Sequence, residues 1–459
     1  MNETERSKML GNMEIRKLVI KLSIPAIAAM AFNALYNLVD TFFVARGASQ
    51  TAIGALSIAY PIQMIILAIG LMIGIGSSSV FSRAYGREDK KTMRSAVNNA
   101  FIFNLVVSLL ISIIAYIFLE DLLVLFGASA SNIGYARDYL VVIIFALIPF
   151  SMSIVFNNLT RAEGRPNVAM FSMIIGALTN IILDPIFIFD WGLGLGVSGA
   201  AWATFVGKGL SFLYVFYMAM RPESALNIHF KTLHQIDVKM IFEMITVGLP
   251  SFMRVSLGGF LIIIVNNLIN YYAPNDPAMY ISIYGVINRL LRFTLMPGFG
   301  LVQGIVPIVG FNFGAMFYQR LKLAITFTVK LLLGYFIFIF LMVLLFAEAL
   351  FGIFSPEQDA LFITEGARAF RIVAAGFAFI TFQVLMSSVY QAMGYPIRAF
   401  ILALSRRFIL FIPFALLLTS LVGLDGIWWT FFVADIFAGT IAFLMFANEM
   451  RKFNRLIAA

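Results

Sequence analysis

The 459-residue chain contains no cysteine, only two histidines and few charged residues, which make up 12% of it. The absence of cysteine excludes disulfides, thiolate metal sites and cysteine nucleophiles. No HExxH, GxxxxGK[ST] or GxSxG motif occurs, so nothing indicates a zinc protease, a P-loop nucleotide site or a serine hydrolase. GLGVSG at 194–199 fits the GxGxxG pattern, but no Asp or Glu occurs from 200 to 222, which argues against a dinucleotide site.

Apolar residues, in contrast, make up 61% of the chain, and its mean hydropathy is +0.94. No soluble domain can hide that much apolar surface, so the surrounding solvent must be lipid. Strand-like alternation is absent, and apolar runs of about 20 residues recur. We therefore predict an all-α polytopic membrane protein with twelve transmembrane helices. The predicted helices cover residues 15–45, 53–82, 95–119, 134–160, 166–190, 195–219, 240–272, 279–312, 321–347, 361–391, 397–421 and 425–449.

The connections between these helices differ in charge. The two tails and the second, fourth, sixth and eighth connections are basic: Arg6, Lys8, Arg16, Lys17, Arg83, Arg87, Lys90, Lys91, Arg94, Arg161, Arg165, Arg221, Lys231, Lys239, Arg320, Lys322, Arg451, Lys452 and Arg455. The intervening ones are acidic, apart from Arg46: Glu120, Asp121, Asp190, Asp276, Glu348, Glu357, Asp359 and Asp425. The positive-inside rule then predicts that both termini are cytoplasmic. The net charge of +9 faces anionic membrane lipid, so it does not indicate nucleic-acid binding.

The chain repeats itself at offsets between 225 and 230 residues. RAEGRP at 161–166 recurs as QAMGYP at 391–396, and LSIPA at 22–26 as VGLPS at 247–251. Six helices per half, an even number, give a parallel repeat, as in transporters that rock two bundles around a central site. We expect six-helix bundles at 1–220 and 240–459, joined by a cytoplasmic linker at 221–239.

Two carboxylates stand inside predicted helices of the first half. Asp40 lies in LYNLVDTFF at 35–43, and Asp184 in TNIILDPIF at 179–187. The second half has Asn270 and Phe414 at the matching positions. An ionised carboxylate at the bilayer centre costs about 2.5–3.5 kcal/mol on insertion scales, and such residues usually face a partner or a functional path. A role in bundle packing would more naturally recur in both halves, so the asymmetry favours a functional role.

Helical spacing places further polar side chains beside these two acids. Residues three, four and seven apart share one face of a helix. The residues that share a face with Asp40 or Asp184 in this way are Asn33, Tyr36, Asn37 and Asn180.

Thr204, in the sixth predicted helix, could add a further oxygen. Asp40, Asn180, Asp184 and Thr204 together would form an oxygen-only set. Such a set suits either a proton shared between acids or a small cation such as Na⁺. In the structural alternative, an acid simply pairs with Lys208, but one lysine could neutralise only one of the two acids.

The second half is basic where the first is acidic. Its helices carry Arg254, Arg289, Arg292, Arg406 and Arg407. We expect Asp435, an acid in the last helix, to pair with one of these arginines. Some of the arginines could reach the membrane interface, and we interpret the group as structural rather than substrate-binding.

Pro25 lies fifteen residues before Asp40 in the first predicted helix. A proline inside a helix frees a backbone carbonyl and permits a bend. We therefore predict that Pro25 is a hinge that could respond to the charge state of Asp40.

With these residues in place, the sequence resembles the multidrug and toxic compound extrusion (MATE) family, and most of all its DinF-type branch. The resemblance rests on VDTFFVA at 39–45, GALSIAYPI at 54–62, NIILDPIFIF at 180–189, GLGVSGAAWAT at 194–204 and the AxGxP repeats. It implies two six-helix bundles in a V, a coupling site at Asp40, Asn180, Asp184 and Thr204, and a cavity wall that includes Asn33, Tyr36, Asn157 and Met173.

The resemblance implies a monomeric antiporter of a bacterial or archaeal cytoplasmic membrane, and not an enzyme. It would export amphipathic, usually cationic compounds against inward flow of H⁺ or Na⁺, with no cofactor. Because the chain has no nucleotide-binding motif, we expect no ATPase subunit. The alternative is a lipid-linked oligosaccharide flippase of the same superfamily, for which Arg254, Arg289 and Arg292 would offer a basic cavity.

Overall fold

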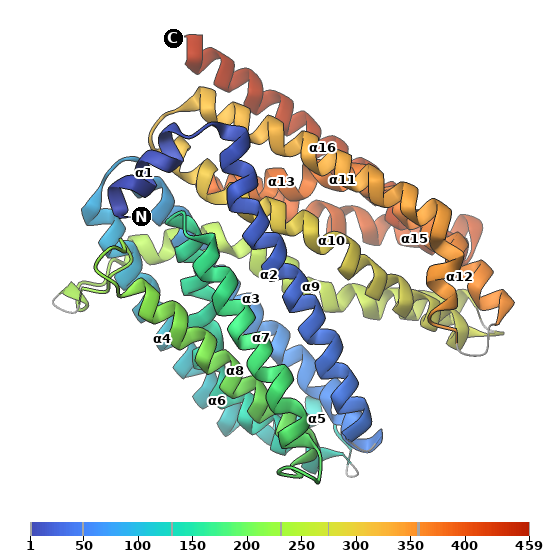
Figure 1. Ribbon diagram of the computed structural model, residues 1–459. Coiled ribbons are helices and arrows are strands. Elements are labelled where there is room, and N and C mark those ends of the chain that lie inside the picture. Colours follow the sequence, from blue (N-terminus) through green and yellow to red (C-terminus); the bar gives the residue numbers. More distant parts are fainter. Residues whose placement is uncertain are drawn as a thin grey trace.

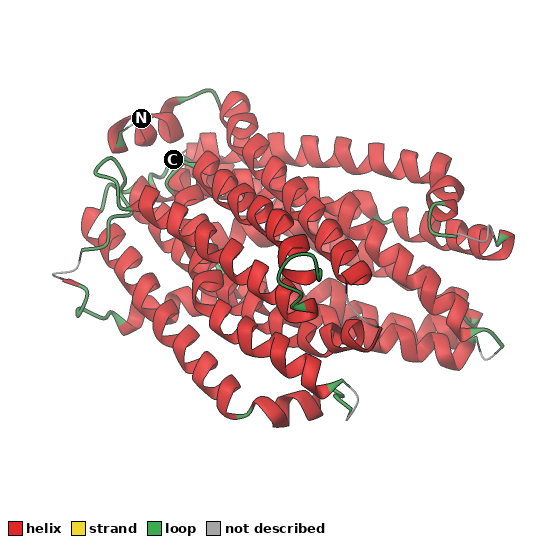
Figure 2. Cartoon of the chain, turned by 60° about the horizontal axis from the view of Figure 1, so that its bottom comes forward, coloured by secondary structure: helices red, strands yellow, loops and turns green. Residues whose placement is uncertain are grey.

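The computed structural model describes residues 2–47, 50–129, 132–229, 232–273, 275–355 and 359–458; Lys231 and Glu357 of the charge pattern lie outside these ranges. Within them all regular structure is helical (Figure 2). The helices are α1 (Glu3–Asn12), α2 (Ile15–Gly47), α3 (Gln50–Gly86), α4 (Lys90–Ile117), α5 (Leu119–Leu125), α6 (Ile133–Ala162), α7 (Pro166–Ile188), α8 (Gly196–Ala219), α9 (Val238–Tyr272), α10 (Pro277–Gly314), α11 (Tyr318–Gly352), α12 (Ala360–Ala374), α13 (Phe377–Met393), α14 (Pro396–Leu404), the π-helical segment η2 (Ser405–Leu410), α15 (Phe411–Val422) and α16 (Asp425–Ala458).

All twelve predicted segments form helices. Among the described residues, ten spans are long and apolar enough to cross a membrane, and α12 with α13 forms an eleventh that is bent by 48°. The sixth predicted segment forms α8, a helix of 24 residues that is not among these spans. The predicted all-α membrane fold is confirmed.

The structure departs from the predicted segments at several places. The short helices α1 and α5 were not predicted, because neither is long and apolar. The predicted helix at 361–391 is broken at Ala375 and Gly376, where α12 ends and α13 begins. The predicted helix at 397–421 contains η2, a π-helical turn of the kind often found at functional sites.

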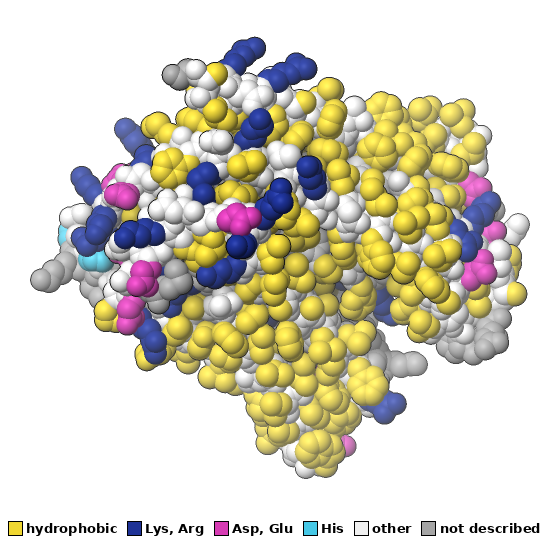
Figure 3. Space-filling model, turned by 45° about the horizontal axis from the view of Figure 1, so that its top comes forward, with side chains coloured by type: hydrophobic (Ala, Val, Ile, Leu, Met, Phe, Trp, Pro, Cys, Tyr) yellow, Lys and Arg dark blue, Asp and Glu magenta, His cyan; other side chains and the backbone are white. Residues whose placement is uncertain are grey.

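The helices form two bundles that diverge as a V (Figure 1). One bundle holds α2–α8 and the other α9–α16, and they meet near the two chain termini. We call this the closed end. Lys and Arg side chains gather over it, whereas the flanks are largely hydrophobic (Figure 3). This distribution fits an apolar belt in lipid with a basic surface on one side.

The internal repeat is visible in the backbone as well as in the sequence. Gly164 and Gly394, 230 residues apart, end helices with positive φ angles of 82° and 76°. Such angles favour glycine, which has no Cβ to clash. Pro166 and Pro396 then begin the next helix in each half, where proline's missing N–H costs nothing.

Several helix pairs join the bundles. α2 packs on α7 in its own bundle and equally on α10 of the other, while α3 packs on both α6 and α9. At the closed end the contact is reciprocal: a Cβ added to Gly86 would lie 2.0 Å from the carbonyl oxygen of Phe311, and one added to Gly314 would lie 2.1 Å from that of Arg83. The backbones approach so closely only because both positions are glycine.

The helix α1 lies across the closed end and contacts both bundles. Arg6 donates to the fully buried carboxylate of Glu163 in the first bundle, with 2.6 Å between Nη2 and Oε1. From the second bundle, Arg320 donates to the carbonyl oxygens of Leu10, at 3.2 Å, and Met13, at 2.7 Å. The segment before α2 therefore bridges the bundles.

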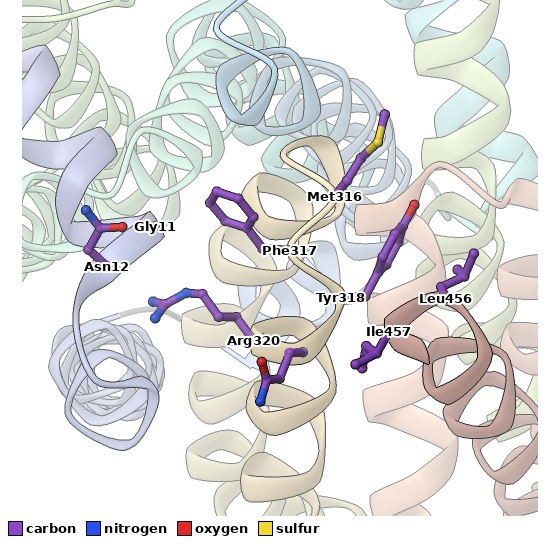
Figure 4. Close-up of a pocket in the computed structure, with 9 residues that line it drawn as sticks. Gly11, Asn12, Met316, Phe317, Tyr318, Arg320, Leu456 and Ile457 are labelled. Atoms are coloured by element: carbon purple, nitrogen blue, oxygen red, sulfur yellow. The ribbon is translucent and has the colours of Figure 1, made fainter. Parts of the chain in front are cut away.

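An open pocket of about 440 Å³ lies beside α1 (Figure 4). Its lining includes Asn12, Phe317, Arg320 and Ile457, from α1, the start of α11 and the end of α16. These elements belong to the closed end, so the pocket is separate from Asp40, which lies near the opposite end of α2.

Candidate functional site in the first bundle

Three neighbouring helices carry the predicted site. Asp40 lies on α2, Asn180 and Asp184 on α7, and Thr204 on α8. α7 packs against both α2 and α8, which brings the three polar faces together. Asn180 and Asp184 share a face because they are four residues apart.

The carboxyl groups of Asp40 and Asp184 lie close enough to interact electrostatically. Asp184 is completely buried, and neither of its carboxylate oxygens has a hydrogen-bond donor. Asn180, 2% exposed, donates its Nδ2 to Oγ1 of Thr204 at 3.3 Å, which leaves its own Oδ1 without a partner. Buried acceptors normally have donors, so this group of oxygens is suited to take up a proton or a small cation.

Lys208 lies near Asp40 but does not neutralise it by direct pairing. Its ammonium is 5.1 Å from the ring centroids of both Tyr36 and Phe150, which are cation–π contacts. Among the described side chains no ion pair links Lys208 to either acid. The structural alternative, a simple buried lysine–carboxylate pair, therefore does not account for Asp40 and Asp184.

Two residues that sequence reasoning missed complete the surroundings. Tyr139 of α6 lies within electrostatic reach of both acids. Gln63 of α3 donates to its hydroxyl, with 2.7 Å between Nε2 and Oη. A lone amide inside the apolar run of α3 could have indicated Gln63, but nothing in the sequence marks Tyr139.

The predicted cavity residues lie in different surroundings. Tyr36 lies at the site, beside Lys208. Asn37 is exposed and donates to the carbonyl oxygen of Asn33, one turn earlier on the same helix, at 2.6 Å. Among the described residues, neither asparagine forms a hydrogen bond to Asp40 or Asp184. Met173 is half-buried on α7.

Asn157 is placed differently from the rest of the predicted cavity wall. It is 4% exposed on α6, where Nδ2 lies 3.4 Å from Oγ of Ser153. The hydroxyl of Ser153 is hydrogen-bonded to that of Ser211, with 3.0 Å between the oxygens, and Ser211 is hydrogen-bonded to Ser172 at 2.8 Å. Asn157 therefore belongs to a buried polar seam between α6, α7 and α8.

Pro25 lies within a continuous α2, close to the other bundle. A Cβ on Gly304 would lie 2.5 Å from Cα of Ser23, and one on Gly300 would lie 2.7 Å from Cα of Ile27. The predicted hinge is thus flanked on both sides by close contacts with α10.

The predicted pairing of Asp435 is confirmed. Asp435, 2% exposed on α16, accepts from Nε and Nη2 of Arg406. Arg289, in contrast, is exposed, with its guanidinium 5.8 Å from the ring centroid of Phe354.

Comparison with known proteins identifies the family. The MatE family profile matches residues 25–186 and 250–417, one match in each bundle. The chain belongs to the MatE family. The multidrug export protein MepA of Staphylococcus haemolyticus (strain JCSC1435) is 28% identical over 95% of this chain and 94% of its own length. MepA of Staphylococcus aureus (strain MSSA476) is 25% identical over 94% and 93%.

Solved structures of MATE transporters agree with this assignment. The MATE multidrug transporter DinF-BH in complex with R6G is 34% identical, with a TM-score of 0.87 over 96% of this chain and 98% of that one. A MATE structure in complex with MaL6 has a TM-score of 0.91 at 23% identity, over 98% and 99% of the two chains. The resemblance drawn from the sequence motifs is therefore confirmed.

Proposed function

We propose that this member of the MatE family is a secondary multidrug antiporter that exports amphipathic, cationic compounds in exchange for H⁺ or Na⁺. The observation that carries the proposal is Asp184, a buried carboxylate with no donor on either oxygen and Asp40 beside it. A site of this kind binds a cation readily and is costly when it is empty.

The residues divide the work by their chemistry. Asp40 and Asp184 hold the coupling cation, while Asn180 and Thr204 supply neutral oxygens that suit Na⁺ as well as an H⁺-linked network. Among the described residues, no cluster of three or more His, Cys, Asp or Glu side chains occurs, so a divalent metal has no comparable site. Exchange follows because the two ligands favour opposing states of one site, and each therefore expels the other.

The proposed setting is a prokaryotic cytoplasmic membrane, with the closed end and both termini on the cytoplasmic side and a monomer as the working unit. The basic surface of the closed end supports this orientation. The V then opens away from the cytoplasm, which is the geometry from which a substrate would be released.

Drug-induced ion flux in everted membrane vesicles tests the proposal, with R6G, the compound bound by DinF-BH, as the probe. We expect Asp40→Asn and Asp184→Asn to abolish coupled exchange while folded protein remains in the membrane. Asp121→Asn is the matched control, because Asp121 is exposed on α5 and far from the site in sequence.

Comparison of vesicles with and without Na⁺ identifies the coupling ion. Exchange that persists fully in both acid variants would refute the proposed site. The two MepA relatives named above are multidrug export proteins, which supports export rather than the flippase alternative.

A further inference from the structure

The second bundle contains a cluster of partly buried arginines with only one carboxylate, Asp435, close to it. Arg407 of η2 lies within electrostatic reach of Arg406, its neighbour in η2, and of Arg254 on α9. Asp435 accepts two hydrogen bonds from Arg406 and also lies within electrostatic reach of Arg407. Neither Arg254 nor Arg407 forms an ion pair with any described side chain, so three guanidinium groups share one carboxylate.

These two arginines are fixed inward. Arg407 donates from Nη1 to the carbonyl oxygen of Arg254 at 2.9 Å, and the same nitrogen would lie 2.9 Å from a Cβ on Gly258. Arg254 donates from Nη2 to Oγ of Ser251 at 3.1 Å. Both residues lie near the middle of their spans, so neither guanidinium can reach the membrane interface as a snorkelling side chain would.

The arginines are nevertheless accessible, since each is only partly buried. Each also uses only part of its five N–H donors on the protein. A guanidinium in the middle of a membrane span is costly without a counter-ion, so the donors that the protein leaves unused favour an anionic partner.

Two local features add independent support. Tyr284 of α10 is 2% exposed, its hydroxyl has no hydrogen-bond partner, and it lies within electrostatic reach of Arg407 and Arg292. The π-helical turn η2 directs consecutive arginines to different partners, Arg406 to α16 and Arg407 to α9. A buried hydroxyl donor without a partner, within electrostatic reach of two guanidinium groups, favours an anionic ligand.

We propose that Arg254, Arg407 and Tyr284 form a binding site in the second bundle for the phosphate or carboxylate group of an anionic amphiphile. The planar guanidinium forks match such groups in two-point hydrogen bonds, and the apolar bundle accommodates the chain. The site is not a repeat of the acid site, because the position matching Arg407 at the 230-residue offset is Ala177. It adds a second ligand class, of opposite charge, to the proposed cation antiporter.

Dodecyl phosphate binding to the purified protein in neutral detergent, followed by native mass spectrometry, tests the site. We expect one specifically bound molecule of dodecyl phosphate. Any binding of the cation dodecyltrimethylammonium should be the same in the wild type and in the arginine variants. Arg254→Gln and Arg407→Gln should each weaken binding about tenfold, since each removes a charged hydrogen-bond donor. Arg407→Lys should fall between them and the wild type, because lysine keeps the charge but loses the fork.

Lys330→Gln is the matched control, since Lys330 is an exposed cation on α11 of the same bundle, and it should bind like the wild type. If the glutamine variants fail to fold, the Arg407→Lys comparison with wild type carries the test. Equal binding by the wild type and all arginine variants, or an equal loss in Lys330→Gln, would overturn the proposal.

A second measurement distinguishes a lipid headgroup from a free amphiphile as the source of the anionic group. Protein is extracted from nanodiscs that contain phosphatidylglycerol or phosphatidylcholine, and the lipid that it retains is identified by native mass spectrometry. Phosphatidylglycerol retained by the wild type and lost from Arg254→Gln would identify a lipid headgroup as the ligand. Dodecyl phosphate binding without retained phosphatidylglycerol would identify a free anionic amphiphile. Binding of neither compound would overturn the site.

Discussion

Arg83 of α3 and Glu243 of α9 form an ion pair between the two bundles, with 2.7 Å between Nη2 and Oε1. The arginine is 13% exposed and the glutamate 44%. One turn earlier, Ser79 donates to the carbonyl oxygen of Gln391 at 2.5 Å, also between the bundles. Part of the closed end is therefore held by polar contacts, which can be exchanged for water when the bundles separate.

Glu243→Gln should shift the protein toward states that are open at this end. The pair is partly exposed, so its loss should cost at most about 1 kcal/mol, which is roughly a fivefold change in population. Because the chain has no cysteine, spin labels at Lys91→Cys and Gln319→Cys would report a single distance between the bundles. A distance distribution identical to that of the parent would contradict the prediction. Arg83→Gln and the double variant complete the cycle that isolates the pair energy.

The reciprocal glycines at the closed end should tolerate no side chain. Gly86→Ala and Gly314→Ala each place a methyl group about 2 Å from a backbone carbonyl oxygen, so we expect a loss of about 1–3 kcal/mol. Thermal unfolding in detergent measures the effect. Gly334→Ala on α11 is the control, because its Cβ would meet nothing within 4 Å and alanine favours a helix. Equal unfolding midpoints for all three variants would show that the close helix contact does not require glycine.

Glu163→Gln should destabilise the closed end strongly. The buried carboxylate accepts from Arg6 at 2.6 Å, from Arg165 at 3.2 Å and from the backbone of Ala225 at 2.7 Å. Removing its charge leaves buried guanidinium groups without their carboxylate, and we expect a loss of about 3–5 kcal/mol in the free energy of unfolding. Denaturant titration in mixed micelles measures this loss. Glu14→Gln, at an exposed pair with Lys17, should change little, and a similar small change in Glu163→Gln would refute the role of this carboxylate.

The proposed orientation predicts which residues can be labelled from outside the cell. Trp191, between α7 and α8, and Lys452, near the end of α16, are both exposed. A membrane-impermeant maleimide should label Trp191→Cys in intact cells, and Lys452→Cys only after permeabilisation. The parent protein, which has no cysteine, provides the blank. The opposite labelling pattern would invert the topology.

The two bundles could be predicted because similar sequence motifs recur at the same stage of each half. RAEGRP and QAMGYP each contain a glycine that ends a helix and a proline that begins the next, so backbone chemistry alone fixes the boundary. The break between α12 and α13 could not be predicted, because apolar residues continue through Ala375 without a proline. The π-helical turn was equally invisible, since one extra residue per turn leaves no compositional trace.

A site residue could be predicted from the sequence when it is a charged residue inside an apolar helix. Asp40 and Asp184 stand out because a buried charge is costly, and the structure brings them together. Tyr139 was missed because its orientation depends on how α6 packs against its neighbours. Asn157 is polar too, but packing places it in the serine seam, and sequence spacing carries no information about that choice.

The packing of α2, the helix that carries Asp40, would link ion binding at the proposed site to the contact between the two bundles. α2 belongs to the first half by sequence, yet it packs as extensively on α10 as on α7. If cation binding at the proposed site draws α2 toward α7, we expect α2 to lose contact with α10. Under the proposed function, cation binding at Asp40 and Asp184 would therefore compete with contact between the halves for one helix, and a single cation would alter both without reaching the second half.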